Sequence, residues 1–420
     1  MYVNITLILI VMKQIIFKVL LIVFTPVLVC AQGITGTWST ASSTGFKARS
    51  NFVAVALNGL IYVIGGRDNN TNDSTMDIYD PSTDSWSTPT TTGTFTPRWG
   101  LGAAAVGGKI YTFGGVNSDL QIGMSTLEVF DPSTNTWSTP TTTGTLIGRD
   151  VFGTTVVNGL IYEMGGYTGS TDISALQVFD PATNTWTMPQ TTGTFTARDG
   201  LTASTVGNNI YTIAGIVDDF SNTLEVLDVT TNTWSTPSTT GWLTTRSNGA
   251  SDVIDGKIYV VGGTNDTVPC VGGLQVFDPT TNAWSTAVTT DTVIPRQGLS
   301  AVSLSGKLYV IGGMKRTSLG LVYSNDIQYF TPAGSSVSMT PAASEITIWP
   351  NPTDGIVTVG GVLSGDWSVT IENPLGDKML STVHVTSLEP SLDLTSLPAG
   401  AYYATFKSQD SIVTKLIVKK

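Results

Sequence analysis

Side chains that could carry out chemistry are few and unevenly placed in this 420-residue chain. Its one histidine, His384, lies in the C-terminal part. The long region before it therefore has no imidazole that could ligate a metal or act as a general base. Ser-His-Asp and Cys-His arrangements cannot be assembled there, and no phosphate-cradling glycine loop is present. Catalysis in this region would have to use carboxylates.

The two cysteines and the acidic loops add no predicted reactive centre. Cys30 falls in a segment that we expect to be removed, which leaves Cys270 without a disulfide partner. Cys270 lies in a polar loop, where we expect an inert small residue rather than a reactive thiol. Loops such as 67–73 are rich in oxygen ligands, but their spacing matches no calcium loop. We therefore predict no metal site and no cofactor.

The remaining candidates are an aromatic residue and two carboxylates that each follow an arginine. They are Trp99, Asp150 and Asp199, which follow Arg98, Arg149 and Arg198. An aromatic face beside a carboxylate suits stacking on, and hydrogen bonding to, a sugar or a peptide, and arginine can meet an acidic group. The alternative is that the two aspartates only pair with these arginines or with turn amides, because ion pairs are common without function.

A repeat of about 49 residues would position these candidates. An apolar run with a central tyrosine recurs six times, at Tyr62, Tyr111, Tyr162, Tyr211, Tyr259 and Tyr309. Five copies end in Gly-Gly, and the fourth ends in Ala214-Gly215, which is small enough to keep a close backbone approach. The period predicts that each copy is one structural unit of a larger array.

Each copy has the pattern of four short strands. An arginine opens a strand of small residues, a tight turn leads into the tyrosine strand, and a third strand ends in Asp-Pro, as in 127–132. The fourth strand contains a tryptophan: Trp86, Trp137, Trp186, Trp234 or Trp284. A four-stranded sheet cannot cover both of its faces, so the copies must stack around an axis. We therefore predict an all-β, six-bladed propeller in which the tyrosines and tryptophans are packing residues.

The sixth copy lacks its tryptophan strand, and the missing strand is found at the other end of the array. Residues 36–40 match residues 135–139, and Trp38 precedes Trp86 by 48 residues, which is one repeat length. The N-terminal segment is therefore predicted to supply the outer strand of the last blade. Such a closure removes the weak seam of an open ring.

Two sets of variable residues should meet at one end of the blades, because the start of strand one and the end of strand two are adjacent in an antiparallel sheet. The first set is Ser50, Trp99, Asp150, Asp199, Ser247 and Gln297, and the second is Arg67, Val116, Tyr167, Ile216, Thr264 and Met314. Variable positions are where an individual site would be formed. The predicted ligand-binding rim is Arg67, Trp99, Asp150, Tyr167 and Asp199, together with Arg98, Arg149 and Arg198. No residue is assigned as catalytic.

The opening arginine, the Tyr-x-x-Gly-Gly strand, the Asp-Pro pair and the spaced tryptophan resemble the Kelch repeat of galactose oxidase and Kelch-like propellers. The resemblance covers about residues 34–332, with Val229 and Thr331 as departures from the Asp-Pro pair. The copper oxidases among such propellers need histidine ligands, which this region lacks. From the rim residues we predict a binding module for an extracellular glycan or protein. The alternative is a carbohydrate-active enzyme of the sialic acid mutarotase or epimerase type that uses rim carboxylates.

The N-terminal segment 1–31 has the pattern of a signal peptide. Lys13 and Lys18 precede an apolar run over 19–29, and residues 29–31 offer a small-residue cleavage pattern. A transmembrane anchor is the alternative, but the lysines leave no run long enough to span a bilayer. The start is either Met1 or Met12. The predicted domains that follow are a propeller over 32–332, a linker over 333–343 and a small β-sandwich over 344–420.

The C-terminal segment has four landmarks: 349–352, 371–376, 393–402 and 415–419. They resemble the type A C-terminal sorting domain of the type IX (Por) secretion system of Bacteroidetes, with Trp349 where that family commonly has tyrosine. This resemblance implies export through the periplasm to the medium or the outer cell surface, with the secretion machinery as a partner. The alternative is an adhesive sandwich domain.

Composition excludes one further class of partner. The formal net charge is −11 and only 12% of the residues are charged. Nucleic-acid affinity is built from clustered lysine and arginine, so we expect no nucleic-acid binding. We expect a monomer.

Overall fold

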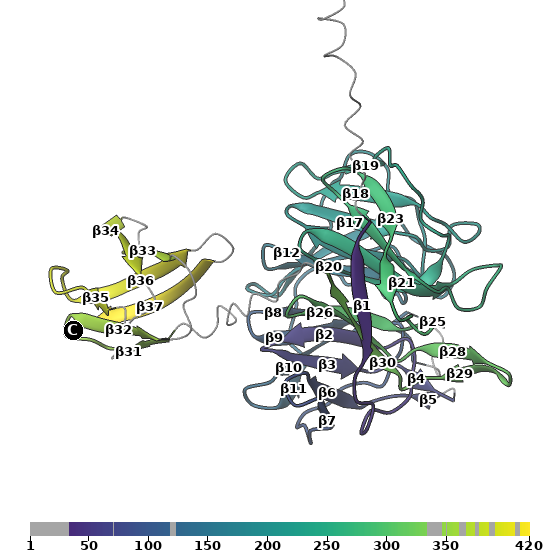
Figure 1. The fold of residues 1–420 in the computed structure, drawn as a ribbon, viewed down its shortest axis with the longest axis horizontal. Helices are drawn as coiled ribbons and strands as arrows, with labels where there is room; N and C mark the ends of the chain where they lie inside the picture. The colour runs from purple at the N-terminus through teal and green to yellow at the C-terminus, as the bar shows by residue number, and fades with distance from the viewer. Residues whose placement is uncertain are drawn as a thin grey trace, which may run out of the picture. The chain divides into compact units, whose positions relative to one another are not determined.

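The computed structural model describes residues 33–69, 71–117 and 123–333, and, further on, 347–349, 351–360, 367–373, 378–385, 391–407 and 412–420. The chain divides into two compact units, Met1–Ala333 and Gly334–Lys420, which are treated separately below (Figure 1). The expected signal peptide, both candidate start residues and nearly all of the expected linker lie outside the described residues.

Throughout the described residues the regular elements are strands. Their hairpins follow from the turn sequences. In the first one, Asn58 and Gly59 have φ angles of 53° and 78°, which is the backbone that a two-residue hairpin turn requires. The turn places Leu57 opposite Leu60, so that the flanking apolar residues pair in register.

The first unit is built around six main sheets, each with four antiparallel blade strands, which we number blades one to six in chain order. Blade one is β2 (Val53–Leu57), β3 (Leu60–Ile64), β6 (Met76–Asp80) and β7 (Ser85–Ser87). Blade two is β8 (Gly102–Val106), β9 (Lys109–Phe113), β10 (Leu127–Asp131) and β11 (Thr136–Ser138). Blade three is β12 (Gly153–Val157), β13 (Leu160–Met164), β14 (Leu176–Asp180) and β15 (Thr185–Thr187).

The remaining blades continue the series. Blade four is β16 (Thr202–Val206), β17 (Asn209–Ile213), β18 (Leu224–Asp228) and β19 (Thr233–Ser235). Blade five is β20 (Ser247–Ile254), β21 (Lys257–Thr264), β22 (Leu274–Asp278) and β23 (Ala283–Thr286). Blade six is β26 (Ser300–Leu304), β27 (Lys307–Ile311), β30 (Ile327–Pro332) and β1 (Thr35–Thr40). Short ribbons extend blades one and six: β4 (Arg67–Asp68) with β5 (Thr71–Asn72), and β25 (Arg296–Gln297) with β28 (Met314–Thr317) and β29 (Gly320–Tyr323).

The N-terminal strand β1 supplies the outer strand of blade six. It pairs antiparallel with β30, with Trp38 opposite Phe330, and it pairs on its other side with β24 (Val288–Thr290) in parallel. The segment that enters blade six therefore runs alongside the strand that completes it. The first and last parts of the propeller are joined by a backbone ladder, which leaves no seam.

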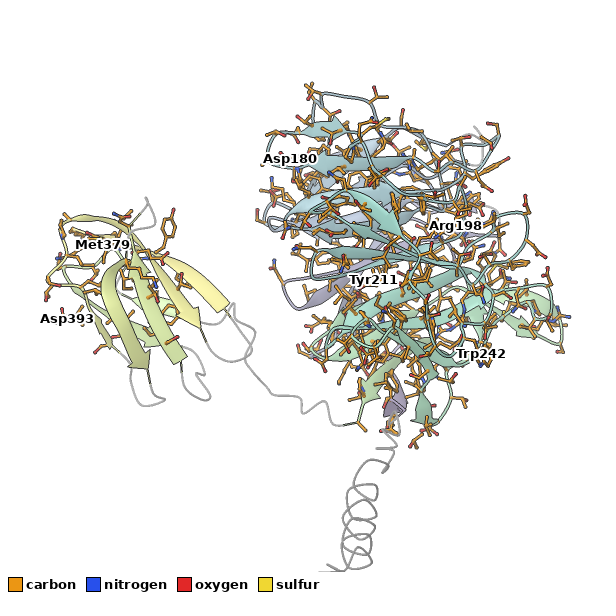
Figure 2. The ribbon with its side chains drawn as sticks, turned by 90° about the horizontal axis from the view of Figure 1, so that it is seen from above. Asp180, Arg198, Tyr211, Trp242, Met379 and Asp393 are labelled. Atoms are coloured by element: carbon orange, nitrogen blue, oxygen red, sulfur yellow. The ribbon has the colours of Figure 1, made fainter. Side chains whose placement is uncertain are left out.

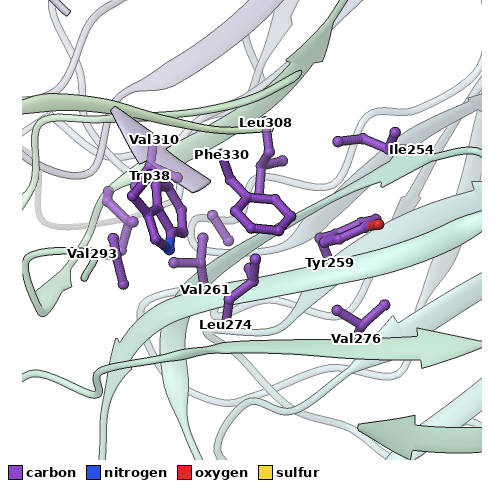
Figure 3. Packing of buried hydrophobic residues seen from close by; sticks show 12 residues of the cluster. Trp38, Ile254, Tyr259, Val261, Leu274, Val276, Val293, Leu308, Val310 and Phe330 are labelled. Atoms are coloured by element: carbon purple, nitrogen blue, oxygen red, sulfur yellow. The ribbon is translucent and has the colours of Figure 1, made fainter. Parts of the chain in front are cut away.

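The inner strands contact one another all the way round, from β2 through β8, β12, β16, β20 and β26 back to β2. One cluster of buried apolar residues fills each of the six interfaces between neighbouring blades. In the cluster between blades five and six, Trp38, Tyr259 and Phe330 pack with aliphatic side chains (Figure 3). The six repeat tyrosines are buried, as are the tryptophans of blades two to five. The fold is thus a closed six-bladed β-propeller, and its aromatic repeat residues form the core.

The opening arginine of every repeat is buried inside its own blade. Each guanidinium binds a polar side chain on the third strand. These partners are Asp77, Glu128, Gln177, Glu225, Gln275 and Gln328, for Arg49, Arg98, Arg149, Arg198, Arg246 and Arg296 in that order. Backbone carbonyls take further donors, as where Arg246 donates to Gly262 at 2.9 Å. A buried guanidinium needs such partners, so each arginine links the segment that leads into its blade to the third strand of that blade.

The second unit is a small β-sandwich. One sheet contains β31 (Thr347–Trp349), β32 (Ile356–Gly360) and β35 (Ser391–Asp393), and the other contains β34 (Lys378–Val385), β33 (Trp367–Glu372), β36 (Gly400–Lys407) and β37 (Ile412–Lys419). Its core includes Val357 and Leu392 from the first sheet and Ile371, Phe406 and Ile417 from the second. The unit therefore has a hydrophobic core of its own.

Candidate functional site

Antiparallel pairing brings the two variable residue sets together at one end of the blades. The pairs are Ser50 with Arg67, Trp99 with Val116, Asp150 with Tyr167, Asp199 with Ile216, Ser247 with Thr264 and Gln297 with Met314. In blade three the pairing is reciprocal: the Asp150 amide donates to the Tyr167 carbonyl at 2.9 Å, and the Tyr167 amide donates to the Asp150 carbonyl at 3.0 Å. The predicted convergence of the two sets is confirmed.

A closed ring of backbone hydrogen bonds lies next to these pairs. The ring is formed by the residue that follows each member of the first set. The amide of each such residue donates to the carbonyl of the corresponding residue in the preceding blade at 2.8–2.9 Å. In chain order these residues are Asn51, Gly100, Val151, Gly200, Asn248 and Gly298, and Asn51 closes the ring by donating to Gly298. All six have positive φ angles, between 46° and 64°. Glycine and asparagine tolerate this region, whereas the β-branched Val151 is strained in it. The ring joins all six blades around the axis.

An open cavity of about 480 Å³ lies against this ring. Its lining includes Arg67, Trp99, Asp150, Tyr167 and Asp199, which are five of the eight residues that the sequence predicted for the rim. Asn51, Val151 and Asn248 of the backbone ring complete the wall together with Val116, Gly123 and Gly169. Four blades thus contribute the predicted chemical groups to one cavity.

Arg67 and Trp99 come from neighbouring blades and contact each other at the cavity wall. The guanidinium carbon of Arg67 lies 4.2 Å from the centroid of the Trp99 ring, within the range of a cation–π interaction. Both side chains are half-buried. One face of the indole is therefore covered by a cation of the protein itself.

The two carboxylates of the cavity are unusual in their protonation. Asp150 is only 6% exposed. Burial, reinforced by the negative charge of Asp199, raises the pKa of Asp150 to about 6. Burial and the charge of Asp172 raise the pKa of Asp199 to about 6 as well. Such values follow when carboxylates lose water and face other carboxylates, and both groups change charge within the physiological range.

Three arginines of the predicted rim do not line the cavity, which corrects that part of the prediction. Arg98, Arg149 and Arg198 are fully buried (Figure 2 labels Arg198) and bind Glu128, Gln177 and Glu225 inside their own blades. Neighbouring residues in extended backbone point to opposite sides, so an arginine directs its side chain into the blade while the next residue faces the cavity. Asp150 and Asp199 consequently do not pair with the arginines that precede them.

Two groups of residues were missed from the sequence. The first is the ring position that includes Asn51, Val151 and Asn248. Its signal is a glycine or asparagine two places after the opening arginine in five of the six copies, with Val151 as the exception. The second is the set of partners of the buried arginines. Its signal is a single polar residue inside each apolar third strand, as Glu128 in 127–130. A polar residue at a buried position implies a polar partner.

Other chemistry is limited in the described part of the chain. No group of three or more histidine, cysteine or acidic residues there is placed to hold a metal ion. Cys270 is buried, its thiol contacts the Met314 carbonyl at 3.5 Å, and burial raises the pKa of that thiol, which keeps it protonated and unreactive. Among the described residues there is also no helix of the length and apolarity needed to cross a membrane.

The fold and the site define a six-bladed β-propeller with an open polar cavity against its axial backbone ring. Residues 24–215 and 200–362 match the model of the KLHDC2/KLHL20/DRC7 Kelch-repeats domain. Because these matches span more than half of the chain, it belongs to the Kelch-repeat family.

Similar proteins share the repeats over a limited length. The Rab9 effector protein with kelch motifs from Bos taurus is 35% identical over 116 residues, which are 26% of this chain and 31% of that protein. An F-box/kelch-repeat protein of Arabidopsis thaliana is 36% identical over 97 residues, 21% of this chain and 24% of the relative. Kelch-like ECH-associated protein 1A of Danio rerio is 34% identical over 114 residues, 27% and 18% of the two chains. The similarity covers less than a third of each relative.

The second unit has a separate match. Residues 347–420 correspond to the secretion system C-terminal sorting domain, the domain that directs type IX secretion. The chain is therefore a Kelch propeller that carries a sorting domain for export. The agreement extends over the whole β-sandwich described above.

Proposed function

We propose that the exported propeller is a binding module that holds an extracellular glycan or protein segment in the cavity formed by Arg67, Trp99, Asp150, Tyr167 and Asp199. One observation carries the proposal: side chains of blades one to four, which are far apart in sequence, converge on one open cavity of about 480 Å³. Cavities of this size with aromatic walls and a few converging polar groups are typical ligand sites.

The chemistry of the wall supports binding by a few strong contacts. Trp99 and Arg67 are residue types that dominate binding energy when a ligand excludes water from them. Tyr167 is 36% exposed and offers a ring face and a hydroxyl to a ligand. The similarity to a Rab9 effector protein supports a protein as the ligand, whereas the aromatic and acidic side chains serve a sugar equally well.

The experiment is a screen of the secreted chain against an oligosaccharide array and a peptide array, followed by the same screen with Trp99→Ala. A hit that Trp99→Ala abolishes supports the cavity as the binding site. Trp242→Ala is the matched control, because Trp242 is an exposed tryptophan outside the cavity lining (Figure 2). Hits that survive Trp99→Ala unchanged would place ligand binding elsewhere and contradict the proposal.

A second candidate function is a carbohydrate-active enzyme of the mutarotase or epimerase type. The raised pKa values of Asp150 and Asp199, both about 6, favour it, because a general acid or base works best near the ambient pH. Product analysis by NMR on any bound sugar tests this candidate. Catalysis would be established if the sugar is turned over and if Asp150→Asn or Asp199→Asn reduces the turnover by about a hundred-fold or more. Binding without turnover would favour the binding module over the enzyme.

The export route is proposed to run through the periplasm, with the sorting domain directing passage across the outer membrane. The match of residues 347–420 to a sorting domain supports it. In a host with the secretion system, the full chain should reach the medium or the cell surface, and a chain that ends at residue 343 should stay in the periplasm. Equal export of both chains would contradict this route.

A further inference from the structure

Three buried acids elsewhere in the propeller are paired with the opening arginine of their blade. Asp77 lies 2.8 Å from the Arg49 guanidinium. Glu128 and Glu225 form ion pairs with other opening arginines. Such pairing is expected for a buried acid, because an ionised carboxylate that contacts neither water nor a cation is strongly destabilised. Asp150 and Asp199 lack such a partner, as Glu163 does, but unlike Glu163 they line an open cavity that a ligand can enter.

Asp150 and Asp199 have no ion pair or side-chain hydrogen bond to another residue in the described part of the chain. Their preceding arginines are occupied inside the blades by Gln177 and Glu225. The groups that act on Asp150 are Asp199, Arg67 and Asp172. Arg67 is held on the Trp99 ring rather than in an ion pair with either acid. Among the described residues, the cavity wall thus presents two carboxylates, and its arginine, Arg67, forms no ion pair with either of them.

We infer that the ligand presents a cationic amine to Asp150 and Asp199. This amine would be the counterion of the two carboxylates, with which no cation among the described residues forms an ion pair. The inference rests on the proposed binding function of the cavity. An ammonium group carries three donors and no acceptor, so it can bind carboxylates from two blades at once. Charge-assisted bonds of this kind are about twice as strong as neutral ones.

The surrounding wall suits the rest of such a ligand. Tyr167 pairs with Asp150 across the strand ends of blade three, so its ring lies beside the carboxylate and can contact the carbon atoms next to the amine. Arg67 remains available for an acceptor on the same ligand. A lysine side chain of a protein and an amino sugar of a glycan both provide the required chemistry, and an experiment can tell these two sources apart.

The test uses the full mature chain and probes matched in pairs that differ only by N-acetylation. One pair is a lysine-containing peptide and its acetyl-lysine form, and the other is a glucosamine oligomer and an N-acetylglucosamine oligomer. Calorimetry is performed at about pH 7 and about pH 5, on either side of the carboxylate titration. We expect the free amine of one pair to bind about ten-fold or more tightly than its acetylated partner at the higher pH. At the lower pH the difference should shrink, because protonation of Asp150 and Asp199 removes the negative charge.

Variants assign the effect to the cavity. Asp150→Asn combined with Asp199→Asn should remove the preference for the free amine. Glu163→Gln is the matched control, because Glu163 is a buried carboxylate of the same blade that does not line the cavity, and the preference should persist in it. The identity of the pair that binds distinguishes a protein ligand from a glycan.

Two results would overturn the inference, and they are distinguishable from failure of the binding function. In the first result, the acetylated probes bind as tightly as the free amines or more tightly, Trp99→Ala abolishes this binding, and the double asparagine variant does not change it. This result overturns the recognition of an amine but leaves the cavity as the binding site. Lack of Trp99-dependent binding by any probe overturns both. A free-amine preference that persists in the double variant also overturns the inference, because the amine would then be recognised elsewhere.

Discussion

The guanidinium of Arg67 in blade one lies 4.2 Å from the centre of the Trp99 ring in blade two. The contact bridges two blades at the cavity wall and involves the residues that follow the first Gly-Gly pair and the second opening arginine. The contact places the guanidinium of Arg67 over the indole, so the positive charge and the tryptophan ring of the cavity wall lie together. Asp150 and Asp199 line the same cavity and form no ion pair with Arg67.

A double-mutant cycle measures this contact. Arg67→Ala and Trp99→Ala should each change the free energy of unfolding slightly, and the coupling energy between them should be about 0.5–1 kcal/mol, as for a half-buried cation–π pair. Urea denaturation of the two single variants and the double variant provides the numbers. Strictly additive effects would show that the two side chains do not interact in solution.

Removal of the Asp150 charge should stabilise the ligand-free protein above pH 6. The pKa of Asp150 rises from 3.8 to about 6 on folding, so the native state binds more protons than the unfolded state between these values. Stability therefore falls as pH rises through this window. Asp150→Asn should be more stable than the parent by about 1–2 kcal/mol at pH 8 and equal to it at about pH 3.5. An Asp150→Asn variant less stable than the parent at pH 8 would contradict an unpaired carboxylate.

Glu163 should contribute a similar pH dependence from within blade three. It is fully buried, both of its carboxylate oxygens lack a hydrogen-bond partner, and burial raises its pKa from 4.5 to about 7 despite the nearby Arg149. Stability should fall as pH rises from about 4.5 to 7. Glu163→Gln should remove the part of this fall that Glu163 contributes and stabilise the protein at pH 8 by about 2–3 kcal/mol.

Glu128→Gln should have the opposite effect to Glu163→Gln, because Glu128 is paired with an arginine. Thermal denaturation of both variants at several pH values measures the two effects. Glu128→Gln removes the anion that pairs with Arg98 and leaves a buried cation poorly compensated. The variant should therefore be less stable than the parent at pH 8. If both glutamine variants shifted stability in the same direction, the difference between the paired and the unpaired carboxylate would be refuted.

A side chain at Gly298 should strain the backbone ring, because it would force the Asn51 side chain to move. A Cβ at this position would lie 2.2 Å from the Asn51 Oδ1 and would sit on a backbone with φ 59°. Gly256→Ala is the control: its φ is 71°, and a Cβ there meets nothing within 4 Å. Gly256→Ala should cost about 1–2 kcal/mol from the backbone alone, and Gly298→Ala should cost more by about 1 kcal/mol or above. Equal losses in urea denaturation would show that the ring yields without strain.

Trp38 should be far more important for stability than Trp242. Trp38 is 3% exposed in the core between blades five and six, whereas Trp242 is 68% exposed. Trp38→Ala should cost about 3–5 kcal/mol through loss of buried area and a cavity, and Trp242→Ala should stay within about 0.5 kcal/mol. Calorimetry of both variants provides the comparison. A small effect of Trp38→Ala would show that β1 does not stabilise the closed ring.

Much of the architecture could be predicted from spacing. Six tyrosine strands one repeat apart, with buried faces that must be shared, lead to six blades, and the Trp38 spacing indicated which strand completes the last one. These inferences succeed because strand pairing within a blade involves nearby residues and because each blade repeats the same apolar pattern. The positions of Asp150 and Tyr167 at one end of blade three follow from the same antiparallel geometry.

The sequence by itself determined the fold class, the six blades and the two residue sets that meet at one end, because these depend on local periodicity. Only the tertiary structure decided which side chains face the cavity. It directs Arg149 into its blade and Asp150 toward the cavity. It also places Arg67 on the Trp99 ring of the next blade and closes the axial ring of backbone hydrogen bonds through Asn51, Val151 and their equivalents. Contacts between blades depend on the distance and rotation from one sheet to the next, which packing of all six blades sets together and no single repeat encodes.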